Sequence, residues 1–212
     1  MIKPFGDKTL FDIACQKLAI ITAVSPYYDC WVSVNEPELK QIATNYPPVC
    51  IWDRTEESAT CDTGVDLMYE WWSSMIEYGY THVVMFNACL PFLTVPTIRK
   101  FCEQFEESEH DGAFAVIPRK DYFWNTKGEM LNEWPEGQDL LNTKAVEETW
   151  CAAHALYGSR LDWIGQGKFV GSYREINDPL LLPVDEVECL DIDYPWQFDM
   201  CEKLYNGGFP YA

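Results

Sequence analysis

The chain has 212 residues, of which 48% are hydrophobic and 15% aromatic, and its formal net charge is −19. This length suits one domain with a substantial core, and the hydrophobic content excludes intrinsic disorder. The acidic balance argues against nucleic acid as a partner, because phosphates need a basic surface. No apolar run is long enough to cross a bilayer, and the first residues lack the apolar core of a signal peptide, so we expect a cytoplasmic protein without a membrane partner.

The pattern of apolar residues predicts alternating helices and strands over the first half of the chain. Apolar side chains at helical spacing predict a helix over 8–19, and Pro37 marks the first turn of another that runs to about 44. The near-continuous apolar run 81–86 is typical of a strand buried on both faces. The other predicted elements are strands at 29–34, 49–52 and 112–117, a helix from Asp62 or Thr63 to 78, and a helix at 94–107. Strands alternating with helices indicate an α/β fold with a mostly parallel sheet.

The regular alternation stops at 118–150, a polar and aromatic stretch punctuated by prolines and glycines. We predict that this stretch leaves the sheet as an excursion. After it we expect a strand at 151–157, a short helix near 159–165 and a final helix from about 196 to 205. There is no internal repeat or linker, so we predict a single domain over 1–212.

Cysteine and histidine give little sign of a metal site. The nine cysteines are scattered without a C-x-x-C pair, and most lie within apolar runs, as in Asp29-Cys30-Trp31-Val32. This pattern favours reduced, buried thiols over a disulfide framework or a zinc site. His82, His110 and His154 are far apart in the sequence, and core or surface positions are favoured for all three over metal binding.

The first candidate functional segment is Asn87–Thr94, which directly follows the most apolar predicted strand. In open α/β sheets, ligands bind beyond the carboxyl ends of the strands, and a helix N-terminus there suits an anionic group. An ordinary strand-to-helix turn rich in proline is an equally good interpretation of the same spacing.

Two further segments carry candidate residues. In Leu190-Asp191-Ile192-Asp193, alternate side chains of an extended segment project to one face, so both carboxylates can hold a divalent cation such as Mg²⁺. The alternative, favoured for this segment by itself, is that one Asp caps the final helix. Arg54 follows a predicted strand and either binds a phosphate or fixes its loop by pairing with Asp53 or Glu56.

Five stretches match a set of known motifs in chain order. The motifs are K-P-L-x-G-K-P-L-I, V-S-T-D-D, R-P-x-x-L-A-x-D-T-x-S-x-x-D, L-Q-P-T-S-P-L-R-T and V-D-I-D-T-E-x-D-F. The matching stretches are Ile2–Leu10, Val32–Glu36, Arg54 with Ala59–Asp66, Asn87–Thr94 and Leu190–Phe198. Together they cover nearly the whole chain and resemble the acylneuraminate and ketodeoxyoctonate cytidylyltransferases.

This resemblance implies a three-layer α/β/α fold of the nucleotide-diphospho-sugar transferase kind. It implies transfer of CMP from CTP to an acidic sugar, such as the sialic acid of the acylneuraminate enzymes, with Mg²⁺ as cofactor. The excursion, with Tyr122-Phe123-Trp124, corresponds to the family's dimer contact and implies a homodimer. The implied site residues are Asp191 and Asp193 as catalytic metal ligands, Arg54, Lys3 and Lys8 for the nucleotide, and Asn87 for the sugar.

The sequence departs from the family at several functional positions. Met1 falls after the family's I-P-A-R-x-G-S-K-G loop, which surrounds the CTP phosphates with backbone N–H groups. This chain has Asn87 where the family has a Gln, Leu93 where it has an Arg, and Ala153 where it has an Asn. Losing one preorganised donor costs roughly 2.7–4 kcal/mol.

Two hypotheses follow: a cytidylyltransferase, or a non-catalytic truncated relative that binds a sugar, a nucleotide or a protein. A nucleotide-sugar glycosyltransferase ranks behind both, because its D-x-D pair usually follows a central strand.

Overall fold

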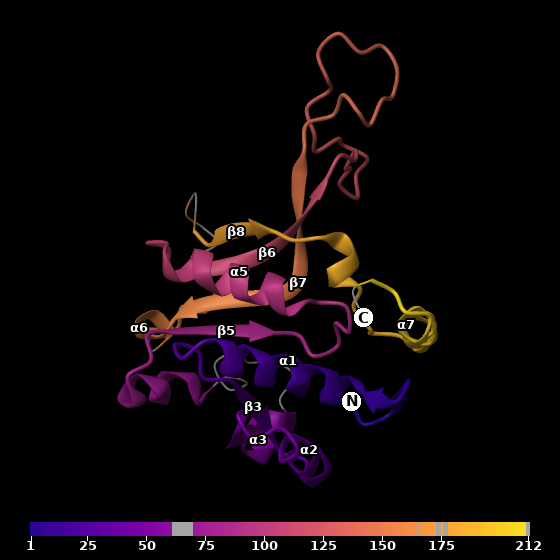
Figure 1. The fold of residues 1–212 in the computed structure, drawn as a ribbon. Helices are drawn as coiled ribbons and strands as arrows, with labels where there is room; N and C mark the ends of the chain where they lie inside the picture. Colours follow the sequence, from indigo (N-terminus) through magenta and orange to yellow (C-terminus); the bar gives the residue numbers. More distant parts are fainter. Residues whose placement is uncertain (61–69, 165, 173–174, 176–177, 211–212) are drawn as a thin grey trace.

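The computed structural model describes residues 1–60, 70–164, 166–172, 175 and 178–210. Its elements, shown in Figure 1, are β1 Pro4–Phe5, β2 Lys8–Thr9, α1 Leu10–Val24, β3 Trp31–Val34, α2 Pro37–Ala43, β4 Cys50–Asp53, α3 Glu56–Thr60, η1 Trp72–Tyr78, β5 His82–Phe86, α5 Val95–Glu106, β6 Gly112–Arg119, β7 Thr149–Arg160, α6 Leu161–Ile164, β8 Leu180–Pro183, η2 Glu186–Cys189 and α7 Pro195–Asn206. The elements η1 and η2 are 3₁₀-helices. The predicted α/β class is confirmed.

The main sheet has four strands in the order β5-β7-β6-β8. β7 runs antiparallel to both β5 and β6, whereas β8 runs parallel to β6. The parallel pair β3-β4 forms a separate sheet, and β1-β2 is a small antiparallel hairpin. The prediction of a mostly parallel sheet is therefore wrong for the main sheet, which is mixed. The excursion is the reason, because it returns the chain beside β6 in the opposite direction without a crossover helix.

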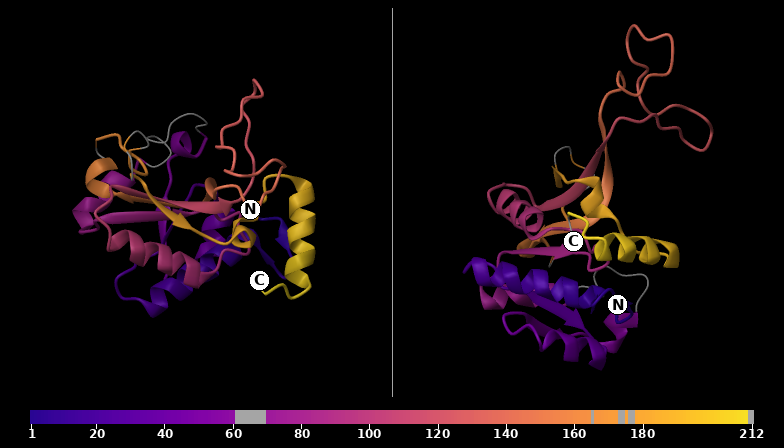
Figure 2. Two further views of the ribbon diagram at one scale, coloured as in Figure 1. Left: turned by 90° about the horizontal axis from the view of Figure 1, so that it is seen from above. Right: turned by 45° about the vertical axis from the view of Figure 1, so that its right-hand side comes forward.

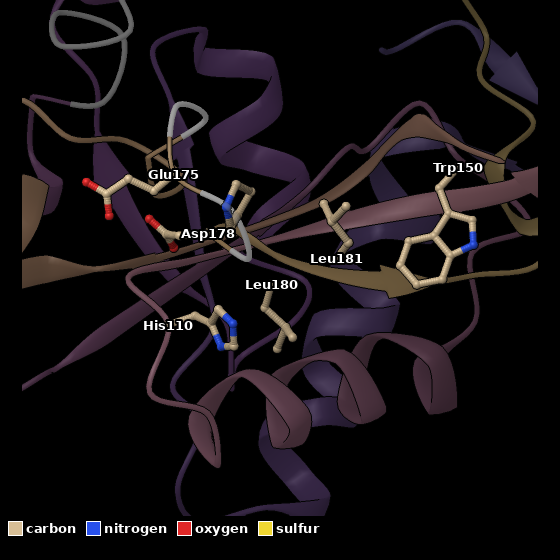
Figure 3. Close-up of a pocket in the computed structure, with 7 residues that line it drawn as sticks. His110, Trp150, Glu175, Asp178, Leu180 and Leu181 are labelled. Carbon is tan, nitrogen blue, oxygen red and sulfur yellow. The ribbon is translucent and has the colours of Figure 1, made fainter. Parts of the chain in front are cut away.

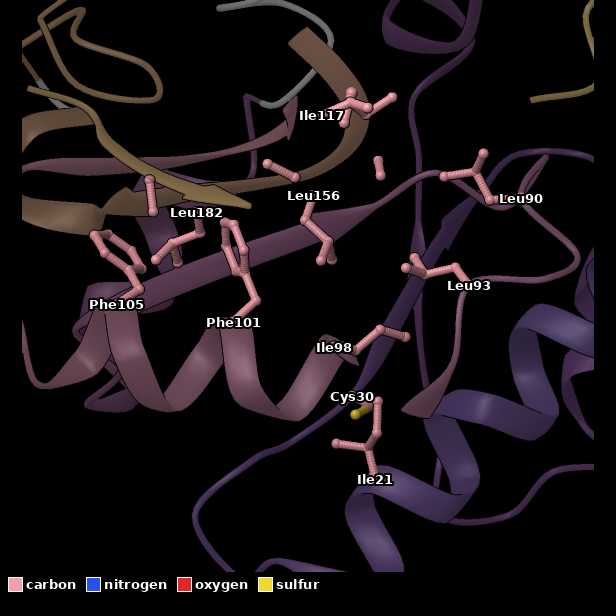
Figure 4. Packing of buried hydrophobic residues seen from close by; sticks show 14 residues of the cluster. Ile21, Cys30, Leu90, Leu93, Ile98, Phe101, Phe105, Ile117, Leu156 and Leu182 are labelled. Carbon is pink, nitrogen blue, oxygen red and sulfur yellow. The ribbon is translucent and has the colours of Figure 1, made fainter. Parts of the chain in front are cut away.

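Helices and loops cover both faces of β5. On one face, Val84 and Phe86 pack against the main core cluster, to which α5 contributes Phe101 and Phe105. Figure 4 shows these two rings projecting from α5 toward the sheet. On the other face, Val83 and Met85 pack against a cluster formed by η1 and α6. The layering expected of an α/β/α fold is thus present around β5.

The excursion predicted at 118–150 is confirmed. Residues 120–148, between β6 and β7, project away from the body of the molecule (Figures 1 and 2). The segment carries large exposed apolar side chains, which are Phe123, Trp124, Leu131, Trp134, Leu140 and Leu141. Its role in a homodimer stays a prediction.

Helix boundaries follow local capping chemistry. Thr9 accepts a hydrogen bond from the backbone N–H of Asp12 (3.1 Å), and Asp12 accepts one from the N–H of Thr9 (3.0 Å). This capping box starts α1 close to the predicted position. The helix predicted from Asp62 or Thr63 to 78 begins outside the described residues, and its described end is the 3₁₀-helix η1 rather than an α-helix. No helix among the described residues is long and apolar enough to span a membrane.

Candidate active site at the carboxyl end of strand β5

Asn87 joins the first and second candidate segments. It directly follows β5, and its side-chain Nδ2 donates to Oδ2 of Asp191 at 3.0 Å, across 104 residues of sequence. Its Oδ1 accepts from the backbone N–H of Cys89 at 2.9 Å. A backbone hydrogen bond from Ile192 to the carbonyl of Cys89 (3.2 Å) ties the two segments together. The amide of Asn87 is therefore held on both sides.

Asp191 is half-buried, and only one of its carboxylate oxygens is engaged. Oδ1 is buried and has no hydrogen-bond partner within the described part of the chain. Burial raises the pKa of Asp191, and the negative charge of Asp193 raises it further. The two carboxylates thus lie close enough to repel each other, and a bound cation would relieve that repulsion.

Asp193 is exposed and does not cap the final helix. Gln197 does this instead: its Oε1 accepts from the backbone N–H groups of Asp193 (2.8 Å) and Tyr194 (2.7 Å) at the start of α7. The capping alternative for the D-x-D segment is therefore wrong, since Tyr194 is the N-cap residue of α7 and Asp191 bonds Asn87. Both carboxylates remain available to a ligand.

His154 is an exposed residue, one of the two positions that the sequence favoured, and its Nδ1 lies 3.1 Å from the hydroxyl oxygen of Tyr157. Among the smaller influences on Asp191, the interaction with His154 lowers the pKa of the carboxyl, against the larger effects of burial and Asp193. The residue lies in β7 with φ of 52°, next to an irregularity in the β6–β7 pairing. Backbone strain of this kind costs about 1–3 kcal/mol and is concentrated at functional sites. Its position follows from the backbone irregularity, for which the sequence gives no signal.

The predicted nucleotide-binding residues are engaged elsewhere. Arg54 donates from Nε to Oγ of Ser58 (3.0 Å) and from Nη2 to the carbonyl of Ser58 (2.7 Å). It therefore fixes its own loop, as one interpretation predicted, but through Ser58 instead of Asp53 or Glu56. Lys3 lies over the ring of Phe198 in α7 (3.6 Å), and Lys8 donates to Gln16 in α1 (2.6 Å). Among the described contacts, none joins these three cations to Asn87 or Asp191.

Leu93 and Ala153 depart from the family motifs because they are core residues here. Leu93 is fully buried and Ala153 is 6% exposed, and both belong to the main apolar cluster. An Arg at the first position or an Asn at the second would have to bury a polar group in this cluster. Leu93 therefore anchors the loop 87–94 in this cluster, to which Ala153 of β7 also belongs.

Lys17 holds the same loop from α1. Its Nζ donates to the carbonyl oxygens of Leu90 (3.0 Å) and Pro91 (2.8 Å). Burial lowers the pKa of Lys17 to about 7, and the negative charge of Glu188 opposes this shift. A neutral amine still has two N–H donors, so it can make both bonds without a buried charge. No local pattern predicted this role, because Lys17 lies within an ordinary helical pattern.

Replacing Lys17 should change how stability depends on pH. The pKa is about 7 in the folded chain and 10.5 when unperturbed, so between these values the unfolded state binds one more proton. The free energy of unfolding of the native chain, compared with that of Lys17→Met, should therefore rise from about pH 7 to about pH 10. Denaturant titrations across this range measure the difference, and Lys203→Met, at an exposed position of α7, is the control. A difference that does not vary with pH would contradict a buried lysine.

Two further observations limit the extent of the site. Among the described residues there is no group of three or more His, Cys, Asp and Glu side chains that could hold a metal ion, so Asp191 and Asp193 stand as a pair. A separate pocket of about 400 Å³ lies beside β8 and is lined by His110, Trp150, Glu175, Asp178, Pro179, Leu180 and Leu181 (Figure 3). None of the predicted site residues is part of this described lining.

No family model matches the sequence, and no curated protein matches it. Several solved structures, however, are similar to this chain. A 4-diphosphocytidyl-2C-methyl-D-erythritol synthase is similar over 96% of this chain and 93% of its own, with a TM-score of 0.63 and 15% identity. The chain has the cytidylyltransferase fold. CMP:2-keto-3-deoxy-manno-octonic acid synthetase complexed with CTP is similar over 97% of this chain and 91% of its own (TM-score 0.61, 11% identity). A cytidylyltransferase from Leptospira borgpetersenii is similar over 99% of this chain and 81% of its own (TM-score 0.59, 10% identity). The fold implied by the sequence motifs is thereby confirmed.

Proposed function

We propose that this chain is a nucleotidyltransferase that transfers CMP from CTP to the hydroxyl of an acidic sugar such as an acylneuraminate. The observation that carries the proposal is the hydrogen bond between Asn87 and Asp191, which joins two segments far apart in sequence at the carboxyl end of β5. Ligands of open α/β sheets bind at this end. Solved cytidylyltransferases with the same fold, one of them complexed with CTP, support the nucleotide assignment.

The donor set fits Mg²⁺, which usually takes one or two protein carboxylates together with substrate phosphates. Asp191 offers a buried oxygen without a partner, and the neighbouring carboxylate of Asp193 is exposed. We propose that these two residues hold the ion, which when bound supplies positive charge that neutralises the phosphates. No third carboxylate is required for this arrangement.

In the proposed reaction, the sugar hydroxyl loses its proton to solvent and its oxygen forms a bond to the α-phosphorus of CTP. The bond from that phosphorus to the bridging oxygen breaks, and pyrophosphate leaves. Asn87 orients the sugar through its amide, which Cys89 and Asp191 hold in place. Arg54, Lys3 and Lys8 are proposed to contact the nucleotide, which requires them to leave their present partners. The chain's main contribution is to position groups and stabilise charge, as in phosphoryl transfer generally.

The direct test is an assay for CMP-sugar and pyrophosphate with CTP, Mg²⁺ and a panel of sugar acids. We expect product with at least one acidic sugar and none with a neutral one. The assay should compare the 212-residue chain with a version that carries a glycine-rich loop ahead of Met1. If neither version forms product with any sugar acid, the proposal is wrong.

One observation favours the second candidate, a non-catalytic relative that binds a sugar, a nucleotide or a protein. The three cations proposed to contact the nucleotide already bond protein groups, and freeing them costs those bonds. Calorimetry with CTP and Mg²⁺ separates the candidates. Tight CTP binding by the 212-residue chain argues against this second candidate, and binding of a sugar acid without CTP supports it.

The exposed apolar side chains on the excursion are the proposed homodimer contact. Large apolar groups on a projecting segment, such as Leu140 at 80% exposure, are typical of surfaces that meet a partner.

A further inference from the structure

Glu188 is buried, unlike every other charged residue in the described part of the chain. It lies in η2 and is 6% exposed, whereas its neighbours Asp185 and Glu186 are exposed. Those two have local partners: Asp185 accepts from the N–H of Val187 (3.0 Å), and Glu186 pairs with Arg119 (2.6 Å). Burying a carboxylate is costly unless hydrogen bonds or an opposite charge compensate, so the position of Glu188 needs an explanation.

The carboxylate of Glu188 binds the start of α5, where the loop 87–94 ends. Its Oε2 accepts from the backbone N–H of Thr94 (2.8 Å), and its Oε1 accepts from the hydroxyl of Thr97 (2.7 Å). Both bonds are charge-assisted, and the positive end of the helix dipole favours an anion there. We call these two bonds the Glu188 clamp. One interpretation of the sequence placed a ligand's anionic group at this helix start, and in the structure Glu188 occupies it instead.

The start of α5 is itself fixed, because the core holds it. Leu93 and Ile98, which flank the clamp residues of α5, are buried in the main apolar cluster (Figure 4). Lys17 bonds two carbonyl oxygens of the preceding loop. Burial lowers the pKa of Lys17, and the charge of Glu188 opposes that shift, so these oppositely charged groups interact. Any segment that is bonded to this helix start is therefore attached to the core.

The clamp gives the segment 188–191 a second attachment to the loop 87–94. At its start, Glu188 bonds the first turn of α5. At its end, Asp191 accepts from Nδ2 of Asn87 at 3.0 Å. A single attachment would allow this short segment to pivot, whereas two attachments fix its direction. Glu188 is thus placed to set the orientation in which Asp191 meets Asn87.

We propose that Glu188 is a positioning residue, whose clamp on α5 holds the segment that carries Asp191 in place against Asn87. It acts through Asp191 and contacts no substrate. Its effect on the junction of the two segments stands on the contacts above, whereas its effect on catalysis rests on the proposed function. Removing a group that orients a metal ligand typically costs 10–100-fold in metal affinity or activity.

The first test needs neither substrate nor metal. It measures hydrogen exchange at the backbone N–H of Ile192, which follows Asp191 and donates to the carbonyl of Cys89 (3.2 Å). Glu188→Ala removes the clamp and should accelerate this exchange at least about tenfold relative to amides of β7 in the same sample. Glu188→Gln keeps an acceptor for the N–H of Thr94, so it should restore a rate within about threefold of the native one.

Two further variants make the result specific. Glu186→Ala, in the same 3₁₀-helix, breaks the ion pair with Arg119 and should leave the exchange of Ile192 unchanged. Thr97→Val removes one bond of the clamp at nearly constant shape, should accelerate the exchange by about threefold, and provides the test if Glu188→Ala does not fold. Equal acceleration in β7 and at Ile192 would mean that Glu188 only stabilises the fold, and would overturn the proposal.

The second test measures how CMP-sugar formation depends on Mg²⁺. In Glu188→Ala, the half-saturating Mg²⁺ concentration should rise about tenfold or more, while the KM for the sugar changes by less than about threefold. Glu188→Gln should restore the native dependence. Faster exchange with an unchanged Mg²⁺ dependence would overturn the positioning role. Absence of product from the native chain would instead refute the proposed function, and the exchange test would still decide whether the clamp holds the junction.

Discussion

Asp191→Asn should abolish CMP transfer without unfolding the chain. Asn has almost the same shape, and its side-chain oxygen can still accept the hydrogen bond from Asn87. It cannot supply a second negative charge to a cation, so we expect activity to fall by about 100-fold or more, as for loss of a preorganised electrostatic group. Because burial and Asp193 raise the pKa of Asp191, its charge disfavours the folded state at neutral pH. The melting temperature should therefore stay the same or rise.

Rates of CMP-sugar formation and thermal melts measure the two effects on the same samples. Asp139→Asn is the matched control, since this carboxylate is exposed on the excursion. It should leave both rate and melting temperature unchanged. If Asp191→Asn retains the native rate, Asp191 has no role in metal binding, and the proposed function loses its central residue. A fall in rate accompanied by a large fall in melting temperature would instead indicate a structural role.

Much of this site was accessible from the sequence because its parts lie at recognisable boundaries. The apolar run of β5 predicted the strand, and Asn87 is the first polar residue after it. The alternation of carboxylates in Asp191 and Asp193 predicted that they share a face. That these segments meet followed only from the resemblance to a family, since no local pattern relates residues 104 positions apart.

The remaining features depend on tertiary contacts that a sequence does not display. Lys17 reads as a surface residue of a helix, and only the packing of α1 beneath the loop 87–94 buries it. His154 has a positive φ at an irregularity in the β6–β7 pairing, which no sequence pattern displays. The direction of β7 also could not be predicted from the sequence. When both faces of a strand are covered, its apolar residues follow the same pattern in parallel and antiparallel pairs.

One discrepancy between sequence and structure concerns β5. The sequence of β5 predicted a strand buried on both faces, yet all five of its residues are only half-buried. Its faces are covered, so the exposure arises at the edge opposite β7 and at a cavity beside it.

Phe92→Ala should destabilise the chain more than any other change within the loop 87–94. Phe92 is fully buried in a cluster with Phe5, Leu10 and Phe198, which fastens the loop to α1 and α7. Its ring also packs edge-on against Phe209, with centroids 5.2 Å apart. Truncating a buried Phe typically costs about 3–5 kcal/mol, from lost apolar burial and from the cavity left behind. We expect a loss of this size in the free energy of unfolding.

Denaturant unfolding monitored by circular dichroism measures the change, and Tyr27→Ala, in the loop after α1, is the control because this residue is 84% exposed. The control should cost less than about 1 kcal/mol. The cluster also fastens the start of α7, which follows Asp191 and Asp193, so the variant should weaken Mg²⁺ binding even where it remains folded. A loss below about 1 kcal/mol for Phe92→Ala would show that the loop is held by backbone bonds, such as those from Lys17, and not by its apolar side chains.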